Sequence, residues 1–269
     1  MNTITARELN ELDLRPPRQL VNGLITAGLN ILAGNPKSGK SFLALGLSLD
    51  LTNGKKALGA YAAEETGVLY LALEDTRYRL RSRMRTLGLP PTELLHFATE
   101  IPRLGEGGLD LIDDFLFQHP EIGMVVIDTL AKVSDPKAGA NVYDEDAALG
   151  GALHALAHHH DAAFLVIHHT RKAPHGDFLH TVSGSAGFTG TADTVLVLNR
   201  KRGENTATLE VTGRDILEAQ AELRWVKSGG GWRARQPDAH PGPIPRYAVR
   251  KLGEAVDGVD DTIDGTERA

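Results

Sequence analysis

The sequence predicts an α/β fold with a mainly parallel sheet flanked by helices, followed by antiparallel hairpins toward the C-terminus. Two observations predict it. Short apolar runs of strand length alternate with longer helical patterns, and glycine-containing turns separate the last runs. Strands that alternate with helices are joined by crossover connections and form a parallel sheet, whereas short turns join antiparallel strands.

The first 19 residues predict an N-terminal arm. A short helical pattern is followed by Arg15-Pro16-Pro17-Arg18, where the two prolines favour extended chain. We expect one core domain over residues 20–235, with no convincing boundary inside it. Residues 236–269 form a C-terminal extension, and its acidic, glycine-rich end from Gly253 has the composition of a disordered tail.

The apolar runs predict five buried strands, because each is short and ends in glycine or a polar residue. They cover residues 29–33, 68–73, 94–98, 124–127 and 164–167. Helical patterns follow four of these strands. They cover residues 42–51, 76–87, 109–117 and the leucines at 149, 153 and 156.

The first hairpin is predicted around the turn at residues 202–205, and the second around residues 228–231, with Trp225 and Trp232 on its arms. The helix at residues 76–87 carries an arginine at every second position from Arg77 to Arg85. This spacing spreads charge around a helix, so it indicates a solvated face or salt bridges to a neighbour.

Composition excludes several classes of protein. The chain has 269 residues and no cysteine, so disulfides and cysteine-ligated zinc are excluded, in keeping with a reducing cytoplasm. Its net charge of −6 is unlike that of a dedicated DNA-binding domain. We find no apolar span of transmembrane length, so no membrane partner is expected.

The strongest motif is a phosphate-binding loop that matches G-x-x-x-x-G-K-[ST] between a predicted strand and a predicted helix. We expect its glycines to let backbone N–H groups converge on phosphate, while the lysine reaches the β- and γ-phosphates and the serine hydroxyl binds Mg²⁺. The sequence therefore predicts ATP and Mg²⁺ as cofactors. The predicted nucleotide contacts are Gly34, Asn35, Pro36, Lys37, Ser38, Gly39, Lys40, Ser41 and Phe42.

Asp128 follows four apolar residues and has the position of a Walker B acid. A carboxylate at the carboxyl end of a strand can hold Mg²⁺ through water, together with Ser41. The alternative is an aspartate that caps the next turn.

A glutamate must orient the attacking water, but the residue after Asp128 is Thr129. Glu74 ends the second strand at the same expected edge of the sheet, so it is the predicted catalytic base. Asp75 is the second candidate; otherwise we expect it to be the N-cap of the arginine-rich helix.

Taken together, these segments resemble the RecA-like ATPases, and among them the RepA-type hexameric replicative helicases and related AAA-type proteins. The resemblance covers about residues 20–235. It is carried by residues 20–24, the phosphate loop, residues 69–75, residues 126–130, residues 166–172 and residues 183–185.

The resemblance implies a RecA-like core and roles for further residues. His168 and His169 match the position that senses the γ-phosphate, and Glu74 matches the catalytic glutamate. Arg214 resembles a finger that completes a neighbour's site, with Arg200 and Arg202 as alternatives. A homo-oligomer, with a hexamer favoured, follows from the same resemblance.

Contact with single-stranded DNA is expected from two loops, at residues 131–146 and 170–187. Their basic residues would follow the nucleic-acid backbone. Acidic residues in the first loop oppose this reading, and only Tyr143 and Phe178 offer aromatic stacking. The candidate contacts are Lys132, Lys137, Arg171 and Lys172.

Eleven histidines suggest a metal site, but the run His158-His159-His160 does not support one, because adjacent helical side chains point in different directions. The predicted function is therefore Mg²⁺-dependent ATP hydrolysis by a DNA-dependent motor in replication or recombination. The alternatives are a switch ATPase without translocation and a non-catalytic nucleotide-binding module. A small-molecule kinase lacks an obvious acceptor site or lid.

Overall fold

The computed structural model describes residues 3–14, 16–134, 142–169, 186–226 and 231–235. The strands are β1 (Gln19–Val21), β2 (Ile25–Thr26), β3 (Gly28–Gly34), β4 (Gly67–Ala72), β5 (Leu95–Ala98), β6 (Ile122–Asp128), β7 (Ala163–Ile167), β8 (Thr194–Asn199), β9 (Thr206–Gly213), β10 (Ala219–Val226) and β11 (Gly231–Ala234). The α-helices are α1 (Ala6–Glu11), α2 (Lys40–Thr52), α3 (Arg77–Leu87), α4 (Gly108–Gln118), α5 (Val142–His159) and α6 (Ala186–Thr191). Two short 3₁₀ helices are η1 (Leu104–Glu106) and η2 (Leu130–Lys132).

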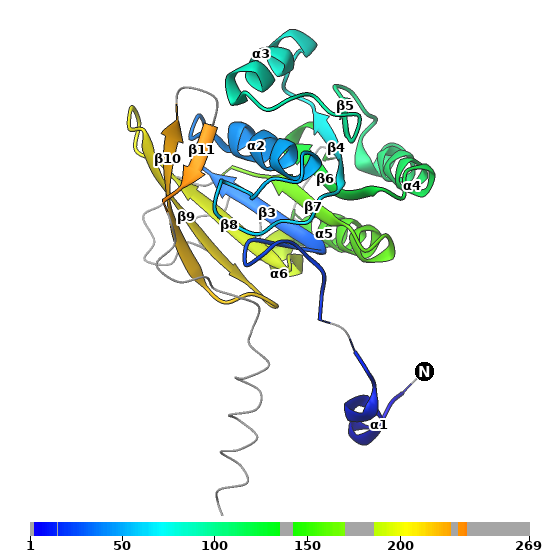
Figure 1. Cartoon of the computed structure of the whole chain (residues 1–269). Coiled ribbons are helices and arrows are strands. Elements are labelled where there is room, and N and C mark those ends of the chain that lie inside the picture. Colours follow the sequence, from blue (N-terminus) through cyan, green and yellow to red (C-terminus); the bar gives the residue numbers. More distant parts are fainter. Residues whose placement is uncertain (1–2, 15, 135–141, 170–185, 227–230, 236–269) are drawn as a thin grey trace, which may run out of the picture.

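The strands form a nine-stranded sheet in the order β11-β10-β9-β8-β3-β7-β6-β4-β5, and β1 and β2 pair separately. The strands from β8 to β5 in this order are parallel, whereas β9, β10 and β11 are antiparallel (Figure 1). The predicted α/β class is confirmed, as are both hairpins. Trp225 and Trp232 are register partners on the second hairpin.

Two apolar layers cover the faces of the sheet. Alternating strand residues divide between them, since Met124 and Val126 pack on the face of α2, and Val125 and Ile127 on the face of α4 and α5. Helices on both faces account for the near-continuous apolar runs of the parallel strands, because these strands are buried on both sides. All seven residues of β6 are buried.

The N-terminal helix α1 lies away from the sheet, and none of its residues is buried (Figure 1). Thr5 begins it with a capping box, in which Thr5 and Glu8 satisfy each other's backbone N–H groups. Within the described part of the chain, we find no helix with the length and apolar character needed to cross a membrane.

Two details differ from expectation. The prediction that Asp75 caps the arginine-rich helix is wrong, because Thr76 is the N-cap of α3 and its hydroxyl accepts from the backbone N–H of Arg79. The Asp75 carboxylate instead pairs with the guanidinium groups of Arg79 and Arg83. The first predicted DNA loop is also shorter than expected, because α5 already begins at Val142.

Candidate nucleotide-binding site

The phosphate loop connects β3 to α2 at the carboxyl edge of the parallel strands. A Cβ on Gly34 would lie 2.6 Å from the carbonyl oxygen of Leu198, so only glycine fits beside β8. Gly39 is the N-cap of α2 with a φ of 104°, a left-handed conformation that favours glycine. The loop therefore directs its amides and the positive end of α2 toward one point, which is a suitable site for phosphate.

Lys40 is buried, and its ammonium group donates to the carbonyl oxygens of Gly34 (2.7 Å) and Asn35 (3.0 Å). Burial lowers the pKa of Lys40 to about 8, although the negative charges of Asp128 and Glu74 oppose this shift. These contributions show that both acids lie close enough to act on the same ammonium group. A bound phosphate would supply the negative charge that a buried ammonium group needs as a partner.

Asp128 ends β6 at the same edge. Its Oδ2 accepts a hydrogen bond from the hydroxyl of Tyr70 at 2.9 Å. Burial raises the pKa of Asp128, and the nearby hydroxyls of Ser41 and Tyr70 partly counter the rise. Burial also raises the pKa of Tyr70 well above its usual value, so this hydroxyl stays a donor. Ser41 and Asp128 are thus close enough to share one Mg²⁺, the first through its hydroxyl.

Glu74 follows β4, next to Asp128 on β6. Its Oε1 accepts from the Thr129 hydroxyl at 3.1 Å. Asp75, whose side chain is only 5% exposed, points to the arginines of α3 and not to a reacting group. The structure therefore separates the two acids, and Glu74 is the one that acts electrostatically on Lys40 and His169.

The two histidines after β7 differ in their surroundings. The Nδ1 of His168 lies 3.0 Å from the carbonyl oxygen of His169, and its ring lies near that of Phe188. Burial and the charge of Lys40 lower the pKa of His169. A neutral imidazole near Lys40 and Glu74 can exchange hydrogen bonds with a phosphate or with water.

Three buried side-chain atoms in the described ranges have no hydrogen-bond partner: Ser38 Oγ, Asp128 Oδ1 and His169 Nδ1. All three belong to the phosphate loop or to the strand ends beside it. Buried polar atoms are nearly always paired, and an unpaired one is costly. Phosphate oxygens, Mg²⁺ and its water ligands offer the missing partners, so the residues present fit ATP with Mg²⁺.

The remaining residues of the loop are exposed or pack against the second hairpin. Asn35, Pro36 and Lys37 are exposed on the outer side of the loop, and Lys37 has a positive φ of 64°. The Phe42 ring packs edge-on to Trp225, with the Arg83 guanidinium 5.1 Å from its centre. This ring is therefore engaged by the hairpin, which leaves the backbone N–H of Phe42 as the part that can reach phosphate.

Arg214 lies at the opposite edge of the sheet. It follows β9, whose last residue Gly213 pairs with Thr194 at the amino end of β8. Its guanidinium donates to the Gly190 carbonyl oxygen at 2.8 Å and lies 3.6 Å from Asp193. Arg200 is at the nucleotide edge instead, stacked 5.4 Å from the centre of the Trp232 ring.

Of the predicted DNA contacts, only Lys132 falls among the described residues. It ends η2 just after Asp128 and is exposed. Lys137, Arg171 and Lys172 lie outside the described residues, as does most of both predicted loops.

Sequence reasoning missed three residues that support this site: Tyr70, Thr129 and Trp232. Trp232 is buried, and its indole N–H donates to the Gly39 carbonyl oxygen at 3.2 Å. A tyrosine within the apolar run of β4 was a signal for Tyr70. Nothing in the sequence pointed to the contact between Trp232 and Gly39, because 193 positions separate them.

A phosphate loop after a central strand, with acids at the ends of two neighbouring strands, defines a P-loop nucleotide-binding protein with a RecA-like sheet. Comparisons with known proteins agree. A protein-family model described as "AAA domain" matches residues 2–175, which is more than half of the chain. The chain therefore belongs to this family of P-loop ATPases.

Among solved structures, the ATPase domain of another protein is similar to this chain, with a TM-score of 0.62 at 13% sequence identity. The match covers 78% of this chain and 85% of that chain. At this identity, the likeness shows the fold alone. The comparison with curated proteins finds no match.

Proposed function

We propose that this protein hydrolyses ATP with Mg²⁺. The observation that carries the proposal is the convergence of Lys40, Asp128, Glu74 and His169 at one sheet edge, where three buried polar atoms lack partners. In this proposal, Lys40 and the loop amides hold the phosphates, and Ser41 and Asp128 hold the metal. Mg²⁺ neutralises charge on the phosphates when it is bound.

Glu74 has the role of orienting the attacking water. Thr129 fixes one carboxylate oxygen, which leaves the other free to accept a proton from water. His169 is our choice for the γ-phosphate sensor over His168, because it lies within electrostatic reach of Lys40 and Glu74.

The test of hydrolysis is Glu74→Gln, which keeps the shape of the side chain but removes its basicity. We expect ATP binding to persist and turnover to fall by about 10²-fold or more. The matched control is Glu106→Gln, an exposed glutamate of η1 that should leave both unchanged. Unchanged turnover in Glu74→Gln would rule out this base, and absence of turnover in the unsubstituted protein would favour a non-catalytic module.

We further propose that hydrolysis drives a DNA-dependent motor of the replicative helicase type, working as a homo-oligomer. The support is the resemblance of the strand-end segments to RepA-type helicases and membership of the AAA family. The second candidate is a switch ATPase of the same fold. The net charge of −6 favours it, and its rate would be the same with and without single-stranded DNA.

A further inference from the structure

Histidine and acidic side chains form three groups in the described part of the chain. In each, one ligand atom per residue lies within 4.8 Å of the others. None belongs to the nucleotide site. The groups are His96 with His119 and Glu121, Asp113 with His159 and His160, and His154 with His158 and Asp193.

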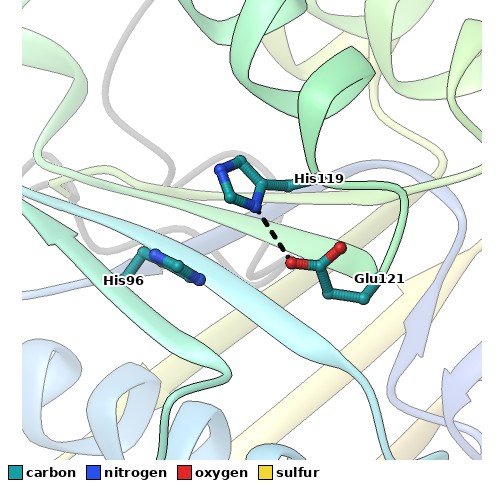
Figure 2. A group of neighbouring side chains, drawn as sticks. All are labelled: His96, His119 and Glu121. Carbon is teal, nitrogen blue, oxygen red and sulfur yellow. Dashed lines mark hydrogen bonds and ion pairs between the residues drawn. The ribbon is translucent and has the colours of Figure 1, made fainter.

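The first group brings together three segments at the amino-end edge of the sheet. His96 lies on the edge strand β5, His119 is the C-cap of α4, and Glu121 immediately precedes β6. His119 Nδ1 lies 3.0 Å from Glu121 Oε1. Figure 2 shows this pair with the His96 ring beside it, one ring nitrogen turned toward the carboxylate.

Packing defines the orientation of both histidine rings. The Phe115 ring of α4 stacks on His119 with a centroid distance of 4.3 Å and meets His96 edge-on at 5.4 Å. The turn is held as well, since the Ile122 N–H donates to the His119 carbonyl oxygen at 3.0 Å. The Glu121 carbonyl oxygen accepts from the backbone N–H of Gly67 and the hydroxyl of Thr66. Such support is what places ligands in metal sites.

The charge around Glu121 also suits a cation. Its pKa is lowered, first by its own backbone N–H and then by a hydrogen bond with His119, so the carboxylate is ionised. The third group differs, because the Arg214 guanidinium lies 3.6 Å from Asp193 and the Leu29 N–H also donates to that carboxylate. A fixed cation and a backbone donor already use the oxygens that a metal would need.

The second group is also less suited to a metal. His160 already lies 2.6 Å from Asp113, which makes a close hydrogen-bonded pair. His159 and His160 come together here because α5 ends at His159, so the helical rule that separates adjacent side chains no longer applies. Asp113 is an exposed side chain of α4, with no described contact that holds its backbone for this role.

We propose that His96, His119 and Glu121 bind one first-row transition-metal ion of the Zn²⁺ class, with two nitrogen ligands and one oxygen ligand. Ligand atoms about 2.0–2.2 Å from tetrahedral zinc lie about 3.4 Å apart, so small rotations of these side chains would close the site. A water molecule would take the fourth position. The ion would attach the edge strand β5 to the turn between α4 and β6 and stabilise that side of the sheet.

The experiment titrates untagged, chelator-treated protein with ZnCl₂ by calorimetry and follows thermal unfolding with and without zinc. We expect one zinc ion per chain and a higher melting temperature. Each of His96→Gln, His119→Gln and Glu121→Gln should weaken zinc affinity by at least about tenfold, since even residues that only support ligands contribute that much. The double variant of the two histidines should lose the thermal shift.

Two matched controls decide between the groups. His154→Gln and His160→Gln remove a histidine from the other groups and should bind zinc as the unsubstituted protein does. ATP binding checks that each variant is folded. Absence of zinc binding in the unsubstituted protein would overturn the proposal, as would binding that survives in the double variant or that is lost in either control.

Discussion

Lys40 is the residue at which burial and function conflict most directly. Two backbone carbonyl oxygens are its hydrogen-bond partners, and a buried ammonium group with only neutral partners is costly. This cost accounts for a pKa lowered to about 8. Phosphate oxygens would favour the charged form, so ATP binding should raise this pKa.

The first prediction concerns the pH dependence of ATP binding. Because the free protein begins to lose the Lys40 proton near pH 8 and the complex keeps it, binding takes up a proton above that pH. Affinity should fall by up to about tenfold per pH unit as pH rises above about 8. Titration with a fluorescent ATP analogue across this range measures it. Lys40→Arg stays charged and should show no such decline, while a flat profile in the unsubstituted protein would contradict the prediction.

At the scale of elements, the second hairpin supports the phosphate loop. β11 lies beside the start of α2 (Figure 1), and Trp232 donates to the Gly39 carbonyl oxygen. The Trp225 ring meets Trp232 edge-on at 5.4 Å. A Cβ on Gly39 would lie 2.9 Å from the Trp232 indole nitrogen, so the loop and the hairpin are closely fitted. The antiparallel strands therefore do more than extend the sheet.

The second prediction tests this support with Trp232→Phe, which keeps an aromatic ring but loses the indole N–H. We expect a loss of about 1 kcal/mol in the free energy of unfolding and up to about fivefold in ATP affinity. Denaturant unfolding and nucleotide titration measure the two effects. The control is Trp225→Phe, whose indole N–H makes no hydrogen bond to a described residue. Equal effects in both variants would show that packing alone matters.

On the scale of the whole molecule, the two edges of the sheet have different contents. The nucleotide site gathers at the carboxyl ends of β3, β4, β6 and β7, whereas Arg214 lies at the amino end of β8. Arg214 of one chain therefore cannot reach the phosphate loop of the same chain. If it acts as a finger, it must do so on a second copy, and it must give up Asp193 and Gly190 as partners.

The third prediction concerns assembly. Mass in solution should rise when a non-hydrolysable ATP analogue and single-stranded DNA are both present, and turnover per chain should rise with protein concentration and with DNA. Arg214→Ala should bind ATP normally but lose about 10³-fold in turnover, as expected for an arginine that acts on a neighbour's phosphate. Arg202→Ala is the matched control. A monomer under all conditions, with turnover independent of DNA, would favour the switch ATPase.

Local patterns sufficed for most of the elements and for half of the site. The phosphate loop, β4, β6 and β7 lie where periodicity and strand-end polarity predicted them, because each signal is carried by neighbouring residues. The cap of α3 was misassigned because Asp75 and Thr76 are both good N-caps. Only the ion pairs of Asp75 with Arg79 and Arg83, which depend on the course of the helix, decided in favour of Thr76.

Short-range spacing in the sequence was enough to predict the fold class, the phosphate loop and the acids at two strand ends. Long-range packing was needed to show that Tyr70 holds Asp128, that Thr129 holds Glu74 and that Trp232 supports the loop. It also placed Arg214 at the far edge and brought His96 to His119 and Glu121. These contacts join residues from separate strands, and strand order is set by how the whole sheet buries its two faces, not by any local pattern.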